Sequence, residues 1–301
     1  MRLEEIPKPG ARRGQLVVAV EAVGVNAVDA TNRADPAGAG IEPPYVVGYE
    51  FAGRIDHVGD RVVGFAAGQP VWGVLPVRGT RWGTYAEFVA VDARFVAERP
   101  RTLDAVEAAA IPLAGATALQ LLDRLEPNVG DWLLILGAAG GVGSLLVQLA
   151  RARGANVAGS ASKARHRLLR ELGVEVVLDR EDDDVMARSV EKIGAEPNAV
   201  ADLVGHGLLA RSLFCIREGG KAATIVALTG DLEEAIDRNI TLHGVLVRPQ
   251  RETLDRLAAA VAAGLLRPVV DEVLDFRSAA IAHRRVESGH GQGKVILRIV
   301  R

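Results

Sequence analysis

The chain has 301 residues, enough for two domains that each bury an apolar core. Charged residues make up 25% of the chain and the formal net charge is only −2. That balance gives no electrostatic reason to expect nucleic acid or an anionic membrane as a partner. A single cysteine, Cys215, excludes an internal disulfide. Without a signal-peptide pattern or a bilayer-length apolar run, a cytoplasmic globular protein of the size of an enzyme is expected.

Residues 15–100 consist of short valine-rich runs separated by Gly, Pro and Asp. The runs are QLVVAVEAVGVN, YVVGYEFAGRIDHVG, RVVGFAAGQPVWGVL and TYAEFVAV. This spacing predicts an irregular β-barrel or sandwich and does not fit alternating strands and helices. Residues 104–125 are rich in Ala and Leu, which predicts two helices separated by Pro112.

Strands and helices alternate from Asp131 onward. WLLILG predicts a buried strand, followed by a glycine turn and a helix from about Val142 to Arg153. Further strand candidates are NVAGSA, EVVLD, AVADLVG, KAATIVAL and ITLHGVLV. The economical architecture is a doubly wound α/β Rossmann sheet of parallel strands with helical crossovers. The tail predicts a helix near 251–263, the strand PVVDEVLDF, a helix near 278–287 and a last strand, KVILRIV.

The glycine-rich segment LGAAGGVGS at 136–144 lies between the buried strand and its helix. Against the pattern G-x-G-x-x-G, Ala138 takes the first position, Gly140 the second and Gly143 the third. A bare second position lets the backbone approach a pyrophosphate, and the third permits close packing of helix on strand. Such turns also occur for structural reasons, but the flanking strand and helix favour nucleotide binding. The residues expected to line the turn are Ala139, Gly140, Gly141, Val142 and Gly143.

The end of the next strand distinguishes between nicotinamide cofactors. NAD-specific sites usually offer an Asp or Glu about 20 residues after the turn. Here residues 159–165 read GSASKAR, without an acid. The hydroxyls of Ser160 and Ser162 and the cations Lys163 and Arg165 suit a 2′-phosphate through charge-assisted hydrogen bonds. An ordinary helix start with Ser162 as N-cap is the alternative, and both can hold at once. We therefore expect NADPH as the cofactor.

A series of motifs extends along nearly the whole chain. In order they are GVNAVD at 24–29, PPYVVGYEFAG at 43–53, GTYAEFVAV at 83–91, AAAIPLAGATALQ at 108–120, GAAGGVGSLLVQLAR at 137–151 and LLRELGVEVVLD at 168–179. LLRPVVDEVLDF and ESGHGQGKVIL follow near the end. With them the chain resembles the zinc-independent quinone oxidoreductase branch of the medium-chain dehydrogenase/reductase superfamily.

The resemblance implies two domains with the active site in the cleft between them. Residues 1–110 and 246–301 are expected to form a GroES-like irregular β-barrel catalytic domain, and 111–245 a Rossmann NADPH-binding domain. Relatives usually have another strand and turn before the segment that resembles residues 1–7. We therefore expect either a later translation start or a shortened chain. The loss of an edge strand would favour covering by a partner chain.

The sequence argues against zinc at two positions. Zinc-dependent relatives place a cysteine where this chain has Asn26 and a histidine where it has Tyr49. Neither Asn nor Tyr is a usual zinc ligand. The six histidines lack ligand spacing, and one cysteine cannot build a four-cysteine lobe. We expect neither a catalytic nor a structural zinc.

Without a metal, the acceptor oxygen needs another electrophile or proton source. The resemblance places Asn26 and Asp29 near the nicotinamide, although both residue types also hold turns through backbone bonds. Many relatives carry Tyr or Lys two residues after the Asp, whereas Thr31 here is a poorer acid. Tyr49 is a substitute candidate, and a buried tyrosine in a β-core is the alternative. A reduced quinone can also take its proton from water.

Three further candidates rest on family analogy. Thr117 would lie near the nicotinamide, the backbone of Val226 and Ala227 would meet its carboxamide, and Lys294 would face the cleft. The alternatives are helix capping or packing for Thr117, core packing for Val226 and an exposed lysine before a strand for Lys294.

Three functions fit these residues. The first is hydride transfer from NADPH to a quinone or an activated C=C or carbonyl acceptor such as an enone. The second is an enoyl-thioester reductase of a biosynthetic pathway, with Arg78, Arg81 and Arg248 as a basic rim. The third, which Thr31 keeps open, is an NADPH-binding sensor or structural protein with little turnover. The expected partner is a small-molecule substrate, not nucleic acid or a membrane, and family analogy suggests a homodimer.

Overall fold

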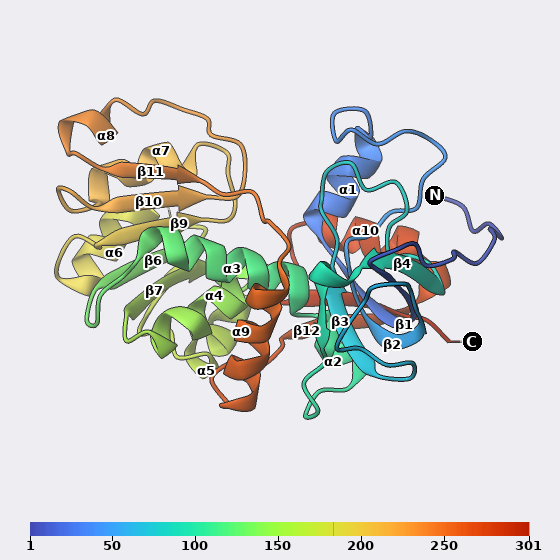
Figure 1. Ribbon diagram of the computed structural model, residues 1–301. Helices are drawn as coiled ribbons and strands as arrows, with labels where there is room; N and C mark the ends of the chain where they lie inside the picture. Colours follow the sequence, from blue (N-terminus) through green and yellow to red (C-terminus); the bar gives the residue numbers. More distant parts are fainter. Residues whose placement is uncertain (183, 301) are drawn as a thin grey trace. The chain divides into compact units, whose positions relative to one another are not determined.

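The computed structural model describes residues 1–182 and 184–300, and the chain divides into two compact units (Figure 1). Unit 1 comprises Met1–Ala116 and Val247–Arg301, and unit 2 comprises Thr117–Leu246. The sequence placed the corresponding boundaries near residues 110 and 245. Over the described residues, no helix is long and apolar enough to cross a membrane.

Unit 1 is built on a mixed sheet of short strands in the order β12-β13-β1-β2-β3-β5, with β4 paired to β1. Its strands are β1 (Gln15–Val25), β2 (Glu50–Val58), β3 (Pro70–Val74), β4 (Phe88–Asp92), β5 (Val96–Glu98), β12 (Val270–Asp275) and β13 (Lys294–Arg298). The helices are α1 (Ala27–Ala34), η1 (Ala93–Phe95), α2 (Ala105–Ala109), α9 (Arg251–Ala262), η4 (Phe276–Ser278) and α10 (Ala279–Glu287). The two sections of the chain therefore share one sheet.

The pairing within unit 1 brings distant polar residues together. β1 runs antiparallel to β13, with Val25 opposite Val295, so the end of β1 lies beside the start of β13. β1 also runs antiparallel to β2, with Ala22 opposite Ala52, which brings the start of β2 to the same place. The first residues of β2 and β13, Glu50 and Lys294, and the residue after β1, Asn26, form the polar cluster described below.

Unit 2 holds a parallel sheet in the order β11-β10-β9-β6-β7-β8 (Figure 1). Its strands are β6 (Trp132–Leu136), β7 (Asn156–Ala161), β8 (Val176–Asp179), β9 (Ala199–Asp202), β10 (Lys221–Thr224) and β11 (Thr241–Gly244). Counted within the unit, this is the order 3-2-1-4-5-6 of the Rossmann fold. The predicted doubly wound parallel sheet is confirmed.

Helices cover the parallel sheet of unit 2. They are α4 (Gly141–Ala152), η2 (Lys163–Arg165), α5 (His166–Glu171), α6 (Val185–Ile193), α7 (Leu208–Ser212), η3 (Leu213–Cys215) and α8 (Glu234–Asp237). α4 packs on β6 and β7, α6 on β7 and β8, and α7 on β9 and β10. The core of the sheet is apolar, because Leu133, Leu134 and Ile135 of β6 are all 0% exposed.

Helix α3 (Pro112–Leu125) begins in unit 1 and continues into unit 2. The predicted separation at Pro112 is confirmed, since α2 ends at Ala109 and the proline takes the first helical position, where its missing N–H costs nothing. The predicted strands AVADLVG, KAATIVAL and ITLHGVLV are shorter than expected and end at Asp202, Thr224 and Gly244. KAATIVAL is a strand only to Thr224, because its neighbours end opposite it at Asp202 and Gly244.

Candidate active site

After the glycine turn between β6 and α4, the first backbone N–H groups of the helix make no hydrogen bond within the helix. The N-cap Gly140 has φ −74° and ψ 178°, and its carbonyl accepts the bond of Ser144 N at 2.9 Å. The amides of Gly141, Val142 and Gly143 precede that bond, so they have no partner within the helix. Amides in this position, together with the helix dipole, stabilise an anion.

Two glycines near this turn are required by the packing of the protein itself. A Cβ on Gly143 would lie 2.3 Å from Gly137 O and 2.8 Å from Ala138 Cα. A Cβ on Gly159 would lie 2.8 Å from the Cβ of Ala138. The close approach of helix to strand that the sequence predicted at Gly143 is therefore present.

Gly140 differs from these two glycines. A Cβ there would meet only Gly137 O, at 3.4 Å, and its φ of −74° suits any residue. Neither backbone conformation nor packing in the described chain accounts for a glycine at this position. A ligand that approaches the backbone closely is the physical reason that remains.

The end of β7 places the four residues predicted to select the cofactor around η2. Ser160 is 4% exposed, and its Oγ accepts from Gly137 N at 3.3 Å, so this hydroxyl holds the glycine turn. Ser162 is the N-cap of η2 without using its side chain for the cap. Lys163 and Arg165 follow within η2, and the Lys163 side chain is 85% exposed.

One acid near these cations was not considered from the sequence. Asp179, the last residue of β8, lies 3.4 Å from Lys163 Nζ through its Oδ2. The backbone N–H of Glu181, which donates to Asp179 Oδ1 at 3.1 Å, and the Lys163 ammonium lower the pKa of this carboxyl. The signal was the acid that ends EVVLD, one strand further along than the usual ribose-binding acid.

Thr117 and Val226 also lie in unit 2. Thr117 is 5% exposed within α3. Val226 lies two residues after β10, and its N–H donates to Thr224 Oγ1 at 3.2 Å. In this structure that amide is thus already engaged by its own chain.

In unit 1, three side chains meet at the junction of β1, β2 and β13. Lys294 Nζ donates to Asn26 Oδ1 at 2.5 Å, to Glu50 Oε1 at 2.5 Å and to Val25 O at 3.1 Å. Lys294 is 4% exposed and Glu50 is 0% exposed. An ammonium has three donors, so none of the three is left for a cofactor.

Glu50 is the centre of this cluster, although it was not among the site residues predicted from the sequence. Its Oε1 accepts from Asn26 Nδ2 at 2.8 Å as well as from Lys294, and its Oε2 accepts from Leu113 N at 2.7 Å. A Cβ on Gly24 would lie 2.3 Å from Glu50 Oε1, so only glycine fits beside it. The available signal was a charged residue at the start of a buried strand, which needs a partner.

Asp29 combines a structural role with an unusual charge state. Its Oδ2 accepts from Asn26 N at 2.8 Å and from Tyr85 Oη at 3.0 Å, so the turn-holding role is present. Its Oδ1 has no hydrogen-bond partner among the described residues. Complete burial raises the pKa of the Asp29 carboxyl to about 7. Near neutral pH this carboxyl therefore exchanges a proton.

Tyr49 and Thr31 have local partners. The Tyr49 hydroxyl accepts from Asn32 Nδ2 at 2.7 Å, and Tyr49 is 2% exposed. Burial raises the pKa of Tyr49, which makes it a weaker acid. Thr31 Oγ1 donates to Ala27 O at 3.1 Å within its own helix. The buried-core alternative for Tyr49 describes what the structure shows of this side chain.

Tyr85 adjoins Asp29 and His283 adjoins Tyr85, and neither residue was singled out from the sequence. Tyr85 donates to Asp29, and burial raises its pKa well above the usual value. The His283 ring packs edge-on to Tyr85 at a centroid distance of 5.7 Å. His283 is 0% exposed, and burial, followed by the charge of Arg33, lowers its pKa to about 4. Their sequence separation of almost 200 residues gave no signal of this contact.

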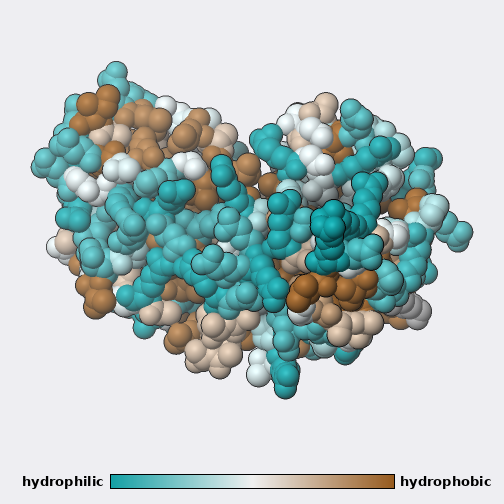
Figure 2. All heavy atoms as spheres, viewed as in Figure 1, coloured by the Kyte–Doolittle hydropathy of each residue, from teal (hydrophilic) through white to brown (hydrophobic). Residues whose placement is uncertain are grey.

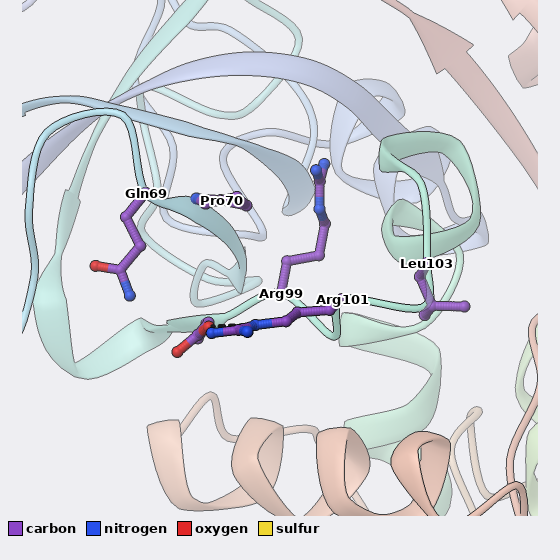
Figure 3. A pocket seen from close by; sticks show the side chains of 6 residues that line it. Gln69, Pro70, Arg99, Arg101 and Leu103 are labelled. Carbon is purple, nitrogen blue, oxygen red and sulfur yellow. Dashed lines mark ion pairs between the residues drawn. The ribbon is translucent and has the colours of Figure 1, made fainter.

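A hollow of about 390 Å³ lies elsewhere in unit 1 (Figure 3). Its lining residues are Gln69, Pro70, Glu98, Arg99, Arg101 and Leu103. Arg99 Nη1 pairs with Glu21 Oε2 at 2.8 Å, and Arg101 pairs with Glu98 at 3.8 Å. None of the residues predicted to act on cofactor or substrate lines this hollow, so it is not part of the candidate site.

In the part of the chain that the structure describes, no group of three or more His, Cys, Asp or Glu side chains could hold a metal ion. The two positions at which zinc-dependent relatives hold ligands are occupied by other contacts here. Asn26 bonds to Lys294 and Glu50, and Tyr49 bonds to Asn32.

Comparison with known proteins identifies the class. Residues 12–101 match the alcohol dehydrogenase GroES-like domain, and residues 172–297 match a family described as zinc-binding dehydrogenase. The chain is 32% identical to the NADPH-dependent alkenal/one oxidoreductase of Arabidopsis thaliana, over 99% of this chain and 75% of that protein. It is also 32% identical to the quinone oxidoreductase of Sus scrofa, over 99% of this chain and 93% of that protein.

Solved structures agree. A quinone oxidoreductase from Coxiella burnetii superposes with a TM-score of 0.90 at 30% identity, over 100% of this chain and 95% of that one. A structure described as an NAD-dependent alcohol dehydrogenase gives 0.92 at 27% identity, over 99% and 95%. The fold and the site thus define a medium-chain dehydrogenase/reductase. Within that superfamily the chain belongs to the quinone oxidoreductase and alkenal/one oxidoreductase branch, and it is an NAD(P)H-dependent oxidoreductase, as the sequence predicted.

Proposed function

We propose that this protein is an NADPH-dependent, zinc-independent reductase that transfers hydride to a quinone or to an activated C=C or carbonyl acceptor such as an enone. The observation that carries the proposal is Gly140. No contact in the described chain requires a glycine there, whereas a bound pyrophosphate would. The names of the two relatives, which state an alkenal/one and a quinone substrate, support the acceptor class.

The preference for NADPH rests on the cations of η2. The exposed Lys163 ammonium and the Arg165 guanidinium follow Ser162, whose hydroxyl is not used as a cap. Together they offer donors to a 2′-phosphate. Asp179 pairs with the Lys163 ammonium at the end of β8. A 2′-phosphate carries more negative charge than this carboxylate and would compete for the ammonium.

When bound, NADPH supplies the hydride, and the residues of the chain bind, orient and manage protons. Asn26 Nδ2 donates to Glu50 Oε1 at 2.8 Å and to Gly24 O at 3.4 Å, and Lys294 Nζ has three acceptors in its own unit, so neither group is a spare donor for an acceptor oxygen. Asp29 is the member of this cluster with a pKa of about 7 and an unpartnered oxygen. We assign to Asp29 the storage of a proton near neutral pH, with water as the final donor to a reduced quinone.

The experiment is NADPH oxidation against a panel of quinones, enones and enoyl thioesters, with Gly140→Val as the binding-site variant. Valine at this φ brings no backbone strain, so it should block the cofactor without unfolding the turn. Gly10→Val is the matched control, since a Cβ at Gly10 meets nothing within 4 Å. We expect wild type and Gly10→Val to turn over quinones or enones and Gly140→Val to lose NADPH binding.

The same panel separates the alternatives. Turnover confined to thioesters would favour the enoyl-thioester reductase, and tight NADPH binding without turnover would favour the sensor or structural protein. Two of the three arginines proposed for a carrier-binding rim already bond to backbone carbonyls. Arg78 Nη1 donates to Gly38 O at 3.0 Å, and Arg81 Nε donates to Pro44 O at 2.9 Å. These contacts favour a structural role for both side chains.

We further propose a homodimer. β11 is the last strand of the parallel sheet, and an edge strand pairs readily with a second copy. Ile236 on α8 is 79% exposed and Leu246, just after β11, is 54% exposed. Apolar side chains gather over the part of unit 2 that carries α8 and β11 (Figure 2). Light scattering on the purified protein tests this, with a mass of twice 31.8 kDa expected and a single-chain mass as the contrary result.

A further inference from the structure

Glu50 and Lys294 form a buried ion pair in unit 1. Their side chains are 0% and 5% exposed. Removing two charges from water costs several kcal/mol per ion, and the pair is tolerated only where further hydrogen bonds satisfy both groups. Here the ammonium has three acceptors and the carboxylate has three donors. Because every donor of the ammonium and both oxygens of the carboxylate have partners, the pair requires its neighbours to keep these positions.

The first neighbour that this pair fixes is Asn26. The two ends of its amide have opposite partners, because Oδ1 faces the Lys294 ammonium and Nδ2 faces the Glu50 carboxylate. A flipped amide would place its NH₂ against the ammonium and its oxygen against the carboxylate. The charges of Glu50 and Lys294 therefore select one orientation of this amide.

The second neighbour is the start of α3. Glu50 Oε2 accepts from Leu113 N, the second residue of the helix, where a carboxylate satisfies an open donor and interacts well with the helix dipole. Thr117 follows four residues later, one turn along the same helix. Glu50 thus holds the first turn of α3 against the polar cluster of unit 1.

The third neighbour is Asp29, whose Oδ2 accepts from the backbone N–H of Asn26 at 2.8 Å, next to the amide that Glu50 and Lys294 hold. The Lys294 ammonium favours the ionised form of Asp29 and the Glu50 carboxylate disfavours it. The cluster holds one cation for two carboxyls, and the direct contact of Lys294 is to Glu50. A proton on Asp29 makes the three groups neutral together.

We propose that Glu50 and Lys294 are positioning residues for the reductase reaction: they hold the Asn26 amide in one orientation and, through their charges, set the protonation of Asp29. The part that concerns turnover rests on the proposed function. The part that concerns Asp29 can be tested on the protein without cofactor or substrate.

Charged and titratable groups surround Asp29 from several elements. Tyr85 donates to it from the segment before β4, and Tyr49 precedes β2. On α10, His283 packs against Tyr85 and Glu287 pairs with Arg33 of α1 at 2.6 Å. Single substitutions of Glu50 and Lys294 leave all these groups in place, so they isolate the effect of the two charges.

The test is a titration of Asp29 by ¹³C NMR of protein labelled at the aspartate carboxyl carbons. The Asp29 signal is the one that Asp29→Asn removes. Lys294→Met removes the ammonium and should raise the pKa of Asp29. Glu50→Gln removes the carboxylate charge from a side chain of the same size and should lower it. We expect shifts of about one unit in opposite directions, and a double variant that lies between the single ones.

The matched control is an ion pair of the same kind on the surface of unit 2. Lys221 and Glu126 pair at 2.7 Å, with side chains 30% and 70% exposed. Lys221→Met and Glu126→Gln should leave the Asp29 titration unchanged. Shifts of the same sign in Lys294→Met and Glu50→Gln, or no shifts, would overturn the proposal. If Lys294→Met does not fold, Glu50→Gln and the charge-neutral double variant still decide it.

Turnover provides the second readout. With wild type active, Glu50→Gln should lower kcat while the dissociation constant for NADPH stays within twofold, because the cofactor cradle lies in other residues. Equal loss of NADPH affinity would contradict a positioning role. A wild type without turnover would overturn the proposed function instead, and the NMR titration would still test the charges.

Discussion

The Tyr85 hydroxyl donates a 3.0 Å hydrogen bond to Asp29 Oδ2, and both residues are buried. This bond favours the ionised form of Asp29, whereas burial favours the protonated form and prevails. The balance leaves a fully buried carboxyl with a pKa of about 7. A group of this kind is suited to holding a proton at physiological pH.

Tyr85→Phe should raise the pKa of Asp29 further, because it removes a hydrogen bond to the charged form while keeping the ring against His283. The expected shift is about one unit. The same ¹³C titration measures it, with Tyr45→Phe as the control for loss of a tyrosine hydroxyl on a half-buried side chain. A lower pKa in Tyr85→Phe would contradict the assignment of this bond.

Asp29 should also make stability depend on pH. Its pKa is about 7 in the folded protein against 3.8 for an ordinary Asp, so the folded state binds the extra proton between these values. The stabilisation is complete below about pH 4 and is lost as the pH rises through 7, an effect of about 4 kcal/mol. Asp29→Asn should therefore gain stability relative to wild type as the pH rises. Urea unfolding at pH 5 and pH 8 measures the difference, and a constant difference would count against the buried acid.

His283 should act in the opposite direction. Burial lowers its pKa from 6.5 to about 4, so the unfolded chain binds the proton first as the pH falls. The stabilisation from a neutral His283 is present above pH 6.5 and is lost as the pH falls through 4, about 3 kcal/mol. His283→Phe, which retains a ring beside Tyr85, should shift acid unfolding to lower pH. Acid titrations followed by circular dichroism test this; an unchanged midpoint would refute it.

The sequence predicted the fold well because the spacing of apolar residues and the Gly and Pro residues that end elements are local features of the chain. The strand WLLILG, its glycine turn and α4 appeared where expected, and so did the break at Pro112. Strand ends were less predictable, since KAATIVAL stops at Thr224 only because its neighbours stop there. That limit comes from the sheet and not from the residues themselves.

The candidate site was predictable only in part, for a similar reason. The residues of the glycine turn are contiguous, so one segment showed them. Glu50, Tyr85 and His283 act through partners far away in the chain, and the pairing of β1 with β13 is what brings Lys294 to Asn26. Family analogy predicted that Lys294 faces the cofactor. In the structure its ammonium donates to Val25 O, Asn26 Oδ1 and Glu50 Oε1, all in its own unit.

The two glycines of the turn should respond differently to alanine. Gly143→Ala places a Cβ 2.3 Å from Gly137 O and should cost about 1–3 kcal/mol of stability. Gly140→Ala meets only a 3.4 Å contact and should leave the melting temperature within about 2 °C of wild type. Thermal unfolding without cofactor distinguishes them. Equal losses would mean that Gly140 also serves the packing of the protein.

Cofactor preference should depend on the cations of η2. Lys163→Met should weaken NADPH binding about tenfold and leave NADH nearly unchanged, because only NADPH carries the 2′-phosphate. Lys192→Met, on the exposed face of α6, is the control for loss of one positive charge in the same unit. Equal effects of Lys163→Met on both cofactors would remove the role given to this side chain.

NADPH oxidation by quinones or enones is the activity proposed for this protein, and the decisive measurement follows NADPH absorbance with wild type, Gly140→Val and Gly10→Val. We expect turnover by wild type and Gly10→Val, and loss of both NADPH binding and turnover in Gly140→Val. NADPH binding that survives in Gly140→Val, or a wild type that binds NADPH and reduces none of these acceptors, would contradict it.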